Sequence, residues 1–183
     1  MKYSPITRAW VVIYRSSASE LYLDTITAAH GTVYAIVNQH SLIKVSANTG
    51  VATPMSAPSV AGSTLSNLMT DSSGHVYVIT TTGTQYSNRD YEVWQYNSQS
   101  DSWYNTGFYS KTGGSLLYKL IADSHGYLYA STQNGTYVLN GTLASGGWKR
   151  IDSAPALYSI INKQNIISLL TRNNGIYQAT PSS

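Results

Sequence analysis

The sequence predicts an all-β fold, a four-bladed β-propeller that is closed by its own N-terminal strand. Three observations lead to this prediction: a turn-and-strand unit that recurs along the chain, short apolar or alternating runs between hairpin-type turns, and no sustained apolar period of 3.6 residues. The 183 residues are 42% hydrophobic and 11% aromatic, which is enough for one domain with its own core.

The recurring unit joins an apolar strand to an alternating strand through a turn that contains glycine. It is clearest at residues 68–78 and 120–130, where the turn reads Asp-Ser-X-Gly in both copies. Residues 25–35 keep the glycine and the tyrosine three residues later, and residues 159–167 form a degenerate fourth copy. Consecutive turns lie 43, 52 and about 39 residues apart, which are intervals typical of propeller blades.

Each repeat holds short runs that predict strands. The first three repeats give 23–28, 32–37, 42–46 and 51–54; 65–70, 75–80, 92–96 and 103–106; and 116–122, 127–132, 135–139 and 148–152. The fourth gives 157–161, 166–170 and 175–179, one strand fewer. We therefore predict blades over about residues 21–57, 63–109, 115–153 and 156–180, in one domain that spans residues 1–183.

A surplus apolar run, Trp10-Val11-Val12-Ile13-Tyr14, precedes the first repeat. An open propeller would expose two unpaired strand edges, which favour aggregation. Pairing residues 9–15 as the outer strand of the last blade would complete that blade and close the ring. A ring that closes within one chain predicts a monomer.

The Asp-X-X-Gly-X-hydrophobic-Tyr units resemble the repeats of bacterial sensor-type and NHL-like β-propellers. Residues 93–97 before Trp103 and residues 137–140 before Trp148 resemble kelch-type third and fourth strands, and the chain is similar in size to a hemopexin-like domain. It lacks the double glycine of kelch blades, the Trp-Asp of WD40 blades and the disulfide of hemopexin-like domains. The resemblance implies the propeller fold but no particular function, because propellers host lectins, enzymes and protein-binding platforms alike.

The composition disfavours several kinds of site and partner. Without cysteine there is no disulfide framework and no thiolate metal site, and no apolar run approaches the roughly 18 residues of a membrane span. A net charge of +3 and a single adjacent basic pair, Lys149-Arg150, disfavour nucleic acid. Few charges with many polar residues favour a secreted or extracellular bacterial protein whose signal peptide is absent from this sequence; the alternative is a cytoplasmic protein.

Asp71 and Asp123 open equivalent turns, in which an aspartate side chain accepts backbone N–H groups two residues on. This structural role is favoured over a calcium site, because each turn offers one carboxylate. His30, His75 and His125 flank the turn glycines, so their placement indicates turn geometry rather than catalysis. We predict no metal site and no cofactor.

The first strand of each blade should line the central channel. Seven residues before the turn glycine stand Asp24, Asn67 and Lys119, and the fourth repeat aligns Ser159. The residues two positions later are all apolar: Ile26, Met69, Ile121 and Ile161. The polar set should therefore lie nearer the channel mouth, and the apolar set deeper in the channel. The polar ring predicts either a site for a small polar ligand or ion, or a solvated channel with an Asp24–Lys119 pair across it.

The longest interval between turns carries an insertion at residues 81–91 that is rich in polar and aromatic side chains. Tyr86, Arg89 and Tyr91 from this insertion, with Tyr109, predict a loop-borne binding surface. Trp103 and Trp148 share one repeat position, the start of the fourth strand, and are predicted to be blade-packing residues.

These features favour a non-enzymatic recognition module that binds a protein or a glycan through one propeller face. One alternative is a glycan-acting lyase or hydrolase that uses Asp24 and Lys119 at the channel mouth. Another is a structural subunit that completes a larger assembly by edge pairing.

Overall fold

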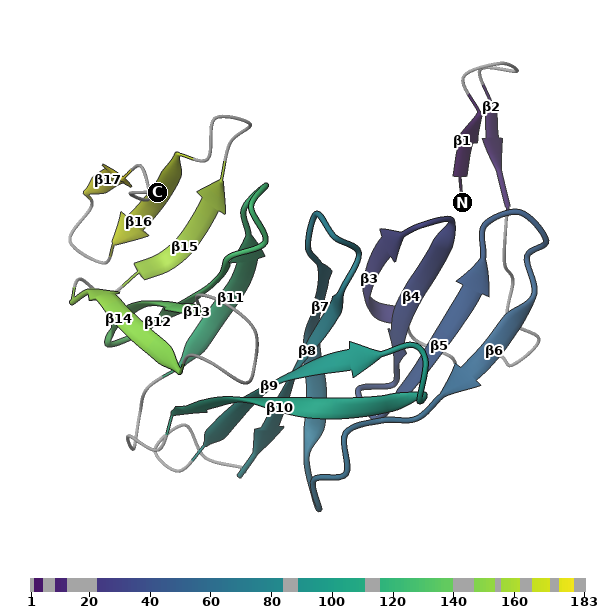
Figure 1. The fold of residues 1–183 in the computed structure, drawn as a ribbon, viewed down its shortest axis with the longest axis horizontal. Helices are drawn as coiled ribbons and strands as arrows, with labels where there is room; N and C mark the ends of the chain where they lie inside the picture. The colour runs from purple at the N-terminus through teal and green to yellow at the C-terminus, as the bar shows by residue number, and fades with distance from the viewer. Residues whose placement is uncertain are drawn as a thin grey trace.

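The computed structural model describes residues 2–4, 9–12, 23–83, 89–110, 116–139, 147–153, 156–161, 166–171 and 175–179. Every regular element in these ranges is a β-strand, and no helix long and apolar enough to cross a membrane occurs in them. The all-β prediction is confirmed. The sheets follow one another along an open arc (Figure 1).

Three sheets have four antiparallel strands each, paired in chain order. They comprise β3 (Leu23–Ala29), β4 (Thr32–Val37), β5 (Ser41–Ser46) and β6 (Ala52–Met55); β7 (Thr64–Thr70), β8 (Val76–Thr82), β9 (Asp90–Asn97) and β10 (Ser102–Ser110); and β11 (Leu117–Ala122), β12 (Leu128–Thr132), β13 (Gly135–Leu139) and β14 (Trp148–Asp152). A three-stranded sheet holds β15 (Ala156–Ile161), β16 (Ile167–Thr171) and β17 (Ile176–Ala179). The predicted strands of all four repeats are therefore present.

The predicted closure of the ring is not found. The strand β2 (Ala9–Val11) pairs with β1 (Lys2–Ser4) as a separate hairpin, and β17 pairs with β16 on one side without a further described strand on the other. The hairpin and β17 lie at opposite ends of the arc (Figure 1). A partner a few residues away costs less loop-closure entropy than one at the far end of the chain, which favours the local hairpin.

The core lies between neighbouring sheets. Side chains from β4, β5 and β8 meet in one cluster, and side chains from β8, β9, β12 and β13 meet in a second. Trp103 packs against Tyr96 in the first cluster, with ring centroids 5.2 Å apart, and Trp148 packs against Phe108 in the second at 4.8 Å. The prediction that these two tryptophans are blade-packing residues is confirmed.

The inner strands β3, β7, β11 and β15 lie next to one another in chain order. Each has a register shift against its partner strand near its start, between residues 23 and 25, 66 and 69, 117 and 119, and 156 and 158. Such β-bulges add one residue to one strand and re-aim the side chains around it. The strict alternation assumed for the channel-lining residues therefore breaks at this level, and Ile26, expected deep in the channel, is 63% exposed.

Candidate ligand-binding site at the start of the inner strands

A cavity of about 550 Å³ opens where the inner strands of three sheets begin. Its lining comes from β3, β7 and β11 and from the segments that flank β8 and β9: Asp24, Thr25, Gln39, Thr64, Leu65, Ser66, Thr81, Gly83, Arg89, Tyr91, Leu116, Leu117 and Tyr118. This volume lies within the range of small-molecule sites, roughly 300–1,000 Å³. The bulges lie at the same level as the cavity, so the backbone irregularity and the hollow occur together.

Asp24 links segments of the cavity wall through a hydrogen bond. Its carboxylate oxygen Oδ2 accepts the backbone N–H of Gln39 at 2.7 Å. The carbonyl of Gln39 in turn accepts the N–H of Leu65 from the next sheet, also at 2.7 Å. Asp24 therefore fixes the β4–β5 turn as a bridge between two sheets, while its side chain remains exposed.

Tyr118 lines the cavity. Its hydroxyl group is buried and has no hydrogen-bond partner among the residues that the structure describes. A buried hydroxyl without a partner costs about 1–3 kcal/mol. A ligand that donates to or accepts from this hydroxyl would recover that cost.

The charges of the lining are balanced. Asp24 supplies one carboxylate and Arg89 one guanidinium, and hydroxyl groups of threonine, serine and tyrosine surround them. Leu65, Leu116 and Leu117 add apolar surface. The described part of this lining suits a polar ligand of low net charge, and Asp24 is the carboxylate that it contributes.

The four predicted channel residues do not gather at this cavity. Asp24 lines it, whereas Asn67 and Lys119 are absent from the lining, and the side chain of Ser159 lies outside the described residues. Asn67 has φ +50° at the bulge of β7, a left-handed conformation in which asparagine is enriched. Backbone geometry accounts for an asparagine at that position.

Two residues of the predicted loop surface lie in the same cavity as Asp24. Tyr91 is buried in its wall and Arg89 is half-buried beside it. Tyr86 and the side chain of Tyr109 lie outside the described residues. The structure thus brings together parts of two sites that the sequence treated as separate.

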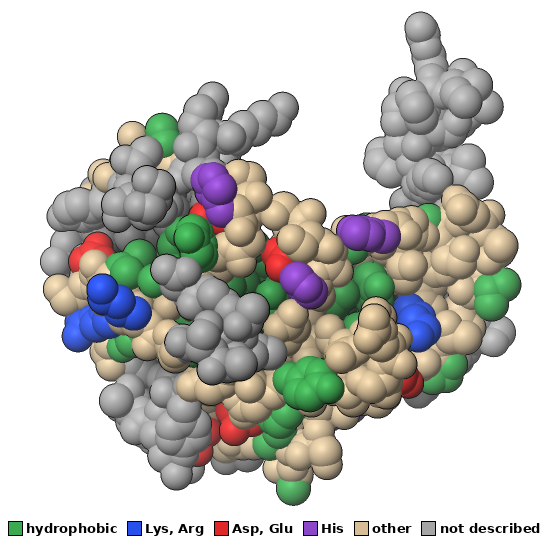
Figure 2. Space-filling model, in the orientation of Figure 1, with side chains coloured by type: hydrophobic (Ala, Val, Ile, Leu, Met, Phe, Trp, Pro, Cys, Tyr) green, Lys and Arg blue, Asp and Glu red, His purple; other side chains and the backbone are tan. Residues whose placement is uncertain are grey.

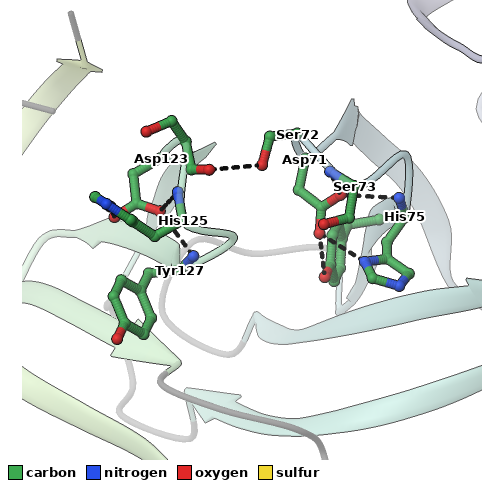
Figure 3. Close-up of polar contacts among 9 residues, drawn as sticks. Asp71, Ser72, Ser73, His75, Asp123, His125 and Tyr127 are labelled. Atoms are coloured by element: carbon green, nitrogen blue, oxygen red, sulfur yellow. Dashed lines mark hydrogen bonds and ion pairs between the residues drawn. The ribbon is translucent and has the colours of Figure 1, made fainter. Parts of the chain in front are cut away.

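The opposite end of the inner strands is built differently (Figure 3). Oδ1 of Asp71 accepts the N–H groups of Ser73 and His75, both at 2.9 Å, and its Oδ2 accepts the hydroxyl of Tyr77 at 3.1 Å. The Nδ1 of His75 lies 2.8 Å from the same Oδ2. The predicted Asx-turn role of Asp71 is confirmed. Both oxygens of its carboxylate are already engaged by groups of the same turn and strand.

Asp123 repeats this arrangement in the next sheet. Oδ1 accepts the N–H groups of His125 and Tyr127 at 2.9 and 2.8 Å, and Oδ2 accepts the Tyr129 hydroxyl at 3.2 Å. Asp123 itself is buried. The aspartate and the tyrosine stand six residues apart in both turns, a spacing that does not by itself predict the bond between their side chains.

Neighbouring turns also contact one another. Ser72 donates a hydrogen bond to the carbonyl of Ser124 at 3.1 Å (Figure 3), and Thr70 donates one to the carbonyl of Ala28 at 3.2 Å. The ring of His30 covers Gly74 so closely that a Cβ atom on residue 74 would lie 2.4 Å from Nε2 of His30.

Histidine side chains are spread over the face shown in Figure 2, where lysine and arginine side chains lie apart rather than in one patch.

These turns shift the ionisation of two tyrosines. Burial, with the Asp71 carboxylate beside it, raises the pKa of Tyr77 above its usual range, and burial with Asp123 raises the pKa of Tyr129 in the same way. Both phenols stay protonated as donors to the carboxylates. We refer to residues 71–77 and 123–129 below as the Asp turns.

Sequence reasoning missed Tyr118 and the serine and threonine residues of the cavity. Tyr118 directly precedes Lys119, which the repeat alignment selected. The bulge of β11 lies at this point and changes which neighbour faces inward. No signal in the sequence marks the bulge itself.

No protein-family model and no curated protein matches the sequence. Solved structures do match in fold. PorZ, a surface component of the type-IX secretion system of Porphyromonas gingivalis, shares 14% identity at a TM-score of 0.63, over 91% of this chain and 28% of PorZ. YCF48 bound to D1 peptide shares 8% identity at a TM-score of 0.64, over 96% of this chain and 56% of that one.

The extracellular domain of a hybrid two component system from B. thetaiotaomicron shares 18% identity at a TM-score of 0.56, over 84% of this chain and 19% of that one. The structural neighbours are β-propeller-type proteins, and they include extracellular sensor domains and surface components. At these identities the likeness shows the fold alone. The chain spans from about a fifth to about half of the length of these three proteins.

Proposed function

We propose that the chain is a non-enzymatic recognition module, secreted or extracellular, that binds a protein or glycan ligand in the cavity at the start of the inner strands. The observation that carries the proposal is Tyr118, which lines the cavity and whose buried hydroxyl has no partner among the described residues. A ligand hydroxyl, amide or carbonyl group would supply that partner. Asp24, Arg89 and Tyr91 would add contacts around it.

The structural neighbours support a recognition role at a coarse level, because they include extracellular sensor domains and surface components. One neighbour is described as bound to a peptide. Propeller scaffolds place ligand sites on loops and strand ends, where this cavity lies. The cavity suits a segment of peptide or one to a few sugar units.

The experiment is a screen on an immobilised glycan array and on a peptide array, followed by calorimetric titration of the strongest hit. We expect Tyr118→Phe and Asp24→Asn each to raise the Kd about tenfold or more, because sites built to hydrogen-bond a group discriminate strongly against its loss. Tyr104→Phe is the matched control, since Tyr104 is exposed on β10 and does not line the cavity. A folded protein without a hit on either array, or wild-type affinity in Tyr118→Phe, would contradict the proposal.

A further inference from the structure

The turn between β4 and β5 has an unusual backbone conformation at Gln39. Five non-glycine residues have positive φ in the part of the chain that the structure describes, and Gln39 has the largest value of the five, +59°. The other four are of types that are enriched in the left-handed region: His30, Asn38, Asn67 and Asp101. Glutamine is not among those types, so this conformation is strained for Gln39, whereas glycine would adopt it freely.

The neighbouring residues show that glycine is the residue expected at position 39. Asn38 has φ +50°, and the N–H of His40 donates to the carbonyl of Val37 at 3.1 Å, which closes the turn. Two consecutive central residues with positive φ are typical of type I′ turns, for which asparagine followed by glycine is the preferred pair. The chain follows this preference at Asn38 and departs from it at Gln39. Such a departure indicates a use of the side chain, because strained residues concentrate at functional sites.

Two hydrogen bonds hold the backbone of Gln39 in place. Its N–H donates to Oδ2 of Asp24, and its carbonyl accepts the N–H of Leu65 from the next sheet, both at 2.7 Å. Both bonds use backbone groups of residue 39, which any residue other than proline would offer. They explain how the turn is fixed, but they do not explain why it carries glutamine.

The side chain of Gln39 is available to a ligand. Gln39 is exposed and lines the cavity, and its amide makes no hydrogen bond with a residue that the structure describes. The amide can donate and accept hydrogen bonds at once. Because the backbone beneath it is fixed, less freedom is lost when the amide is ordered by a ligand.

We propose that Gln39 is a specificity-determining residue of the cavity, and that its side-chain amide binds a ligand group that both donates and accepts hydrogen bonds, such as a hydroxyl or an amide. The inference rests on the proposed ligand site and adds a residue to it. The strained turn is retained because it presents this amide at the cavity. A ligand without such a group would leave the amide unpaired and bind more weakly.

Two substitutions separate the amide from the backbone strain. Gln39→Met keeps an unbranched side chain of similar length and removes the amide, whereas Gln39→Gly removes both the amide and the strain. Wild-type and variant proteins are applied to the same glycan and peptide arrays, and the Kd for the strongest wild-type hit is measured by calorimetric titration. We expect both variants to raise this Kd about fivefold or more, as for the loss of one hydrogen bond.

Urea unfolding without ligand supplies a readout that separates a binding role from a structural one. Gln39→Gly should keep or raise the urea midpoint, because relief of the strain offsets the greater freedom of the unfolded chain. Gln39→Met should leave the midpoint unchanged, since the side chain is exposed. A lower midpoint at unchanged affinity in both variants would show that the glutamine serves the fold, and it would overturn the inference.

Asn38→Gly is the matched control. Asn38 shares the left-handed backbone of the turn but is absent from the described lining of the cavity. Its replacement should leave the Kd unchanged. A rise in Kd as large as that in Gln39→Gly would mean that the turn conformation, and not the Gln39 amide, determines binding, which overturns the inference.

The same measurements separate failure of this inference from failure of the proposed function. A folded wild-type protein that retains no glycan and no peptide contradicts the ligand site itself, and the role of Gln39 is overturned with it. A wild-type protein that binds, with an unchanged Kd in Gln39→Met and Gln39→Gly, overturns the role of Gln39 alone. Weaker binding in both variants at unchanged or higher stability, with full affinity in Asn38→Gly, supports it.

Discussion

The two ends of the inner strands use polar side chains in opposite ways. At the Asp turns each carboxylate is saturated by its own loop: Asp123 accepts two backbone N–H groups and one tyrosine hydroxyl. At the cavity, β-bulges interrupt the ladder, and the Tyr118 hydroxyl has no partner among the described residues. A polar residue therefore indicates a binding site when its hydrogen-bonding capacity is unused, and a structural role when that capacity is filled.

The largest effect should come from removing a saturated carboxylate. Asp123→Ala should lower the free energy of unfolding by about 3 kcal/mol or more, because it leaves several partly buried donors without an acceptor. Asp24→Ala should cost about 1 kcal/mol, since Asp24 accepts one exposed N–H group. Urea denaturation measures both, and equal losses would erase the difference between the two ends.

The next largest effect should be the difference in stability between alanine variants of the glycines in the two Asp turns. Gly74 and Gly126 have φ values of +83° and +86°, so alanine is strained at both, by about 1–2 kcal/mol. A Cβ atom at Gly74 would also meet the His30 ring, whereas at Gly126 it would meet nothing within 4 Å. Gly74→Ala should therefore cost more than Gly126→Ala, with overpacking adding about 1 kcal/mol or more.

His30→Ala restores the space in the Gly74→Ala background and should return the cost to that of Gly126→Ala. Thermal and urea unfolding of Gly74→Ala, Gly126→Ala, His30→Ala and the double variant His30→Ala/Gly74→Ala give the required comparison. Equal destabilisation of the two glycine variants would mean that the His30 ring does not restrict the space at Gly74.

Two tyrosine variants compare a hydroxyl that donates a hydrogen bond with one that has no partner among the described residues. Tyr129→Phe should cost about 1–2 kcal/mol, because it removes a donor to the Asp123 carboxylate. Tyr118→Phe should leave stability unchanged or raise it slightly, because the lost hydroxyl has no described partner. A loss in Tyr118→Phe as large as in Tyr129→Phe would show that the Tyr118 hydroxyl is already satisfied.

The smallest effect is a dependence on alkaline pH. The folded state raises the pKa of Tyr77 and Tyr129, so the protonated phenols contribute stability that is fully present below about pH 10, the pKa of an unperturbed tyrosine. The free energy of unfolding should fall as pH rises above that value. Tyr77→Phe/Tyr129→Phe should flatten this fall, and an unchanged slope would contradict the assignment.

The strands and the Asp turns were predictable from the sequence because their causes are local. Glycine with positive φ, aspartate at the start of a turn and alternating apolar residues act within about ten positions, and they repeat. Every predicted strand of the four sheets is present for this reason.

The cavity and the open arc of sheets were harder to predict from the sequence, because both depend on contacts between residues that are far apart in the chain. One bulge residue in each inner strand changes which side chain faces inward, so Tyr118 lines the cavity beside the position that the alignment selected. Asp24 and Arg89 come together across 65 positions of sequence, through the packing of separate sheets. Ring closure depends on the angle between sheets, which no single strand encodes.

We propose that the cavity end binds ligand while the Asp turns stabilise the fold. The most direct test measures unfolding and ligand affinity together in Tyr118→Phe and Tyr129→Phe, with the strongest hit of the glycan and peptide arrays as the ligand. We expect weaker binding at unchanged stability for Tyr118→Phe, and lower stability at unchanged affinity for Tyr129→Phe. Wild-type affinity in Tyr118→Phe, or weakened binding in Tyr129→Phe at temperatures where it is folded, would contradict this division of roles between the two ends.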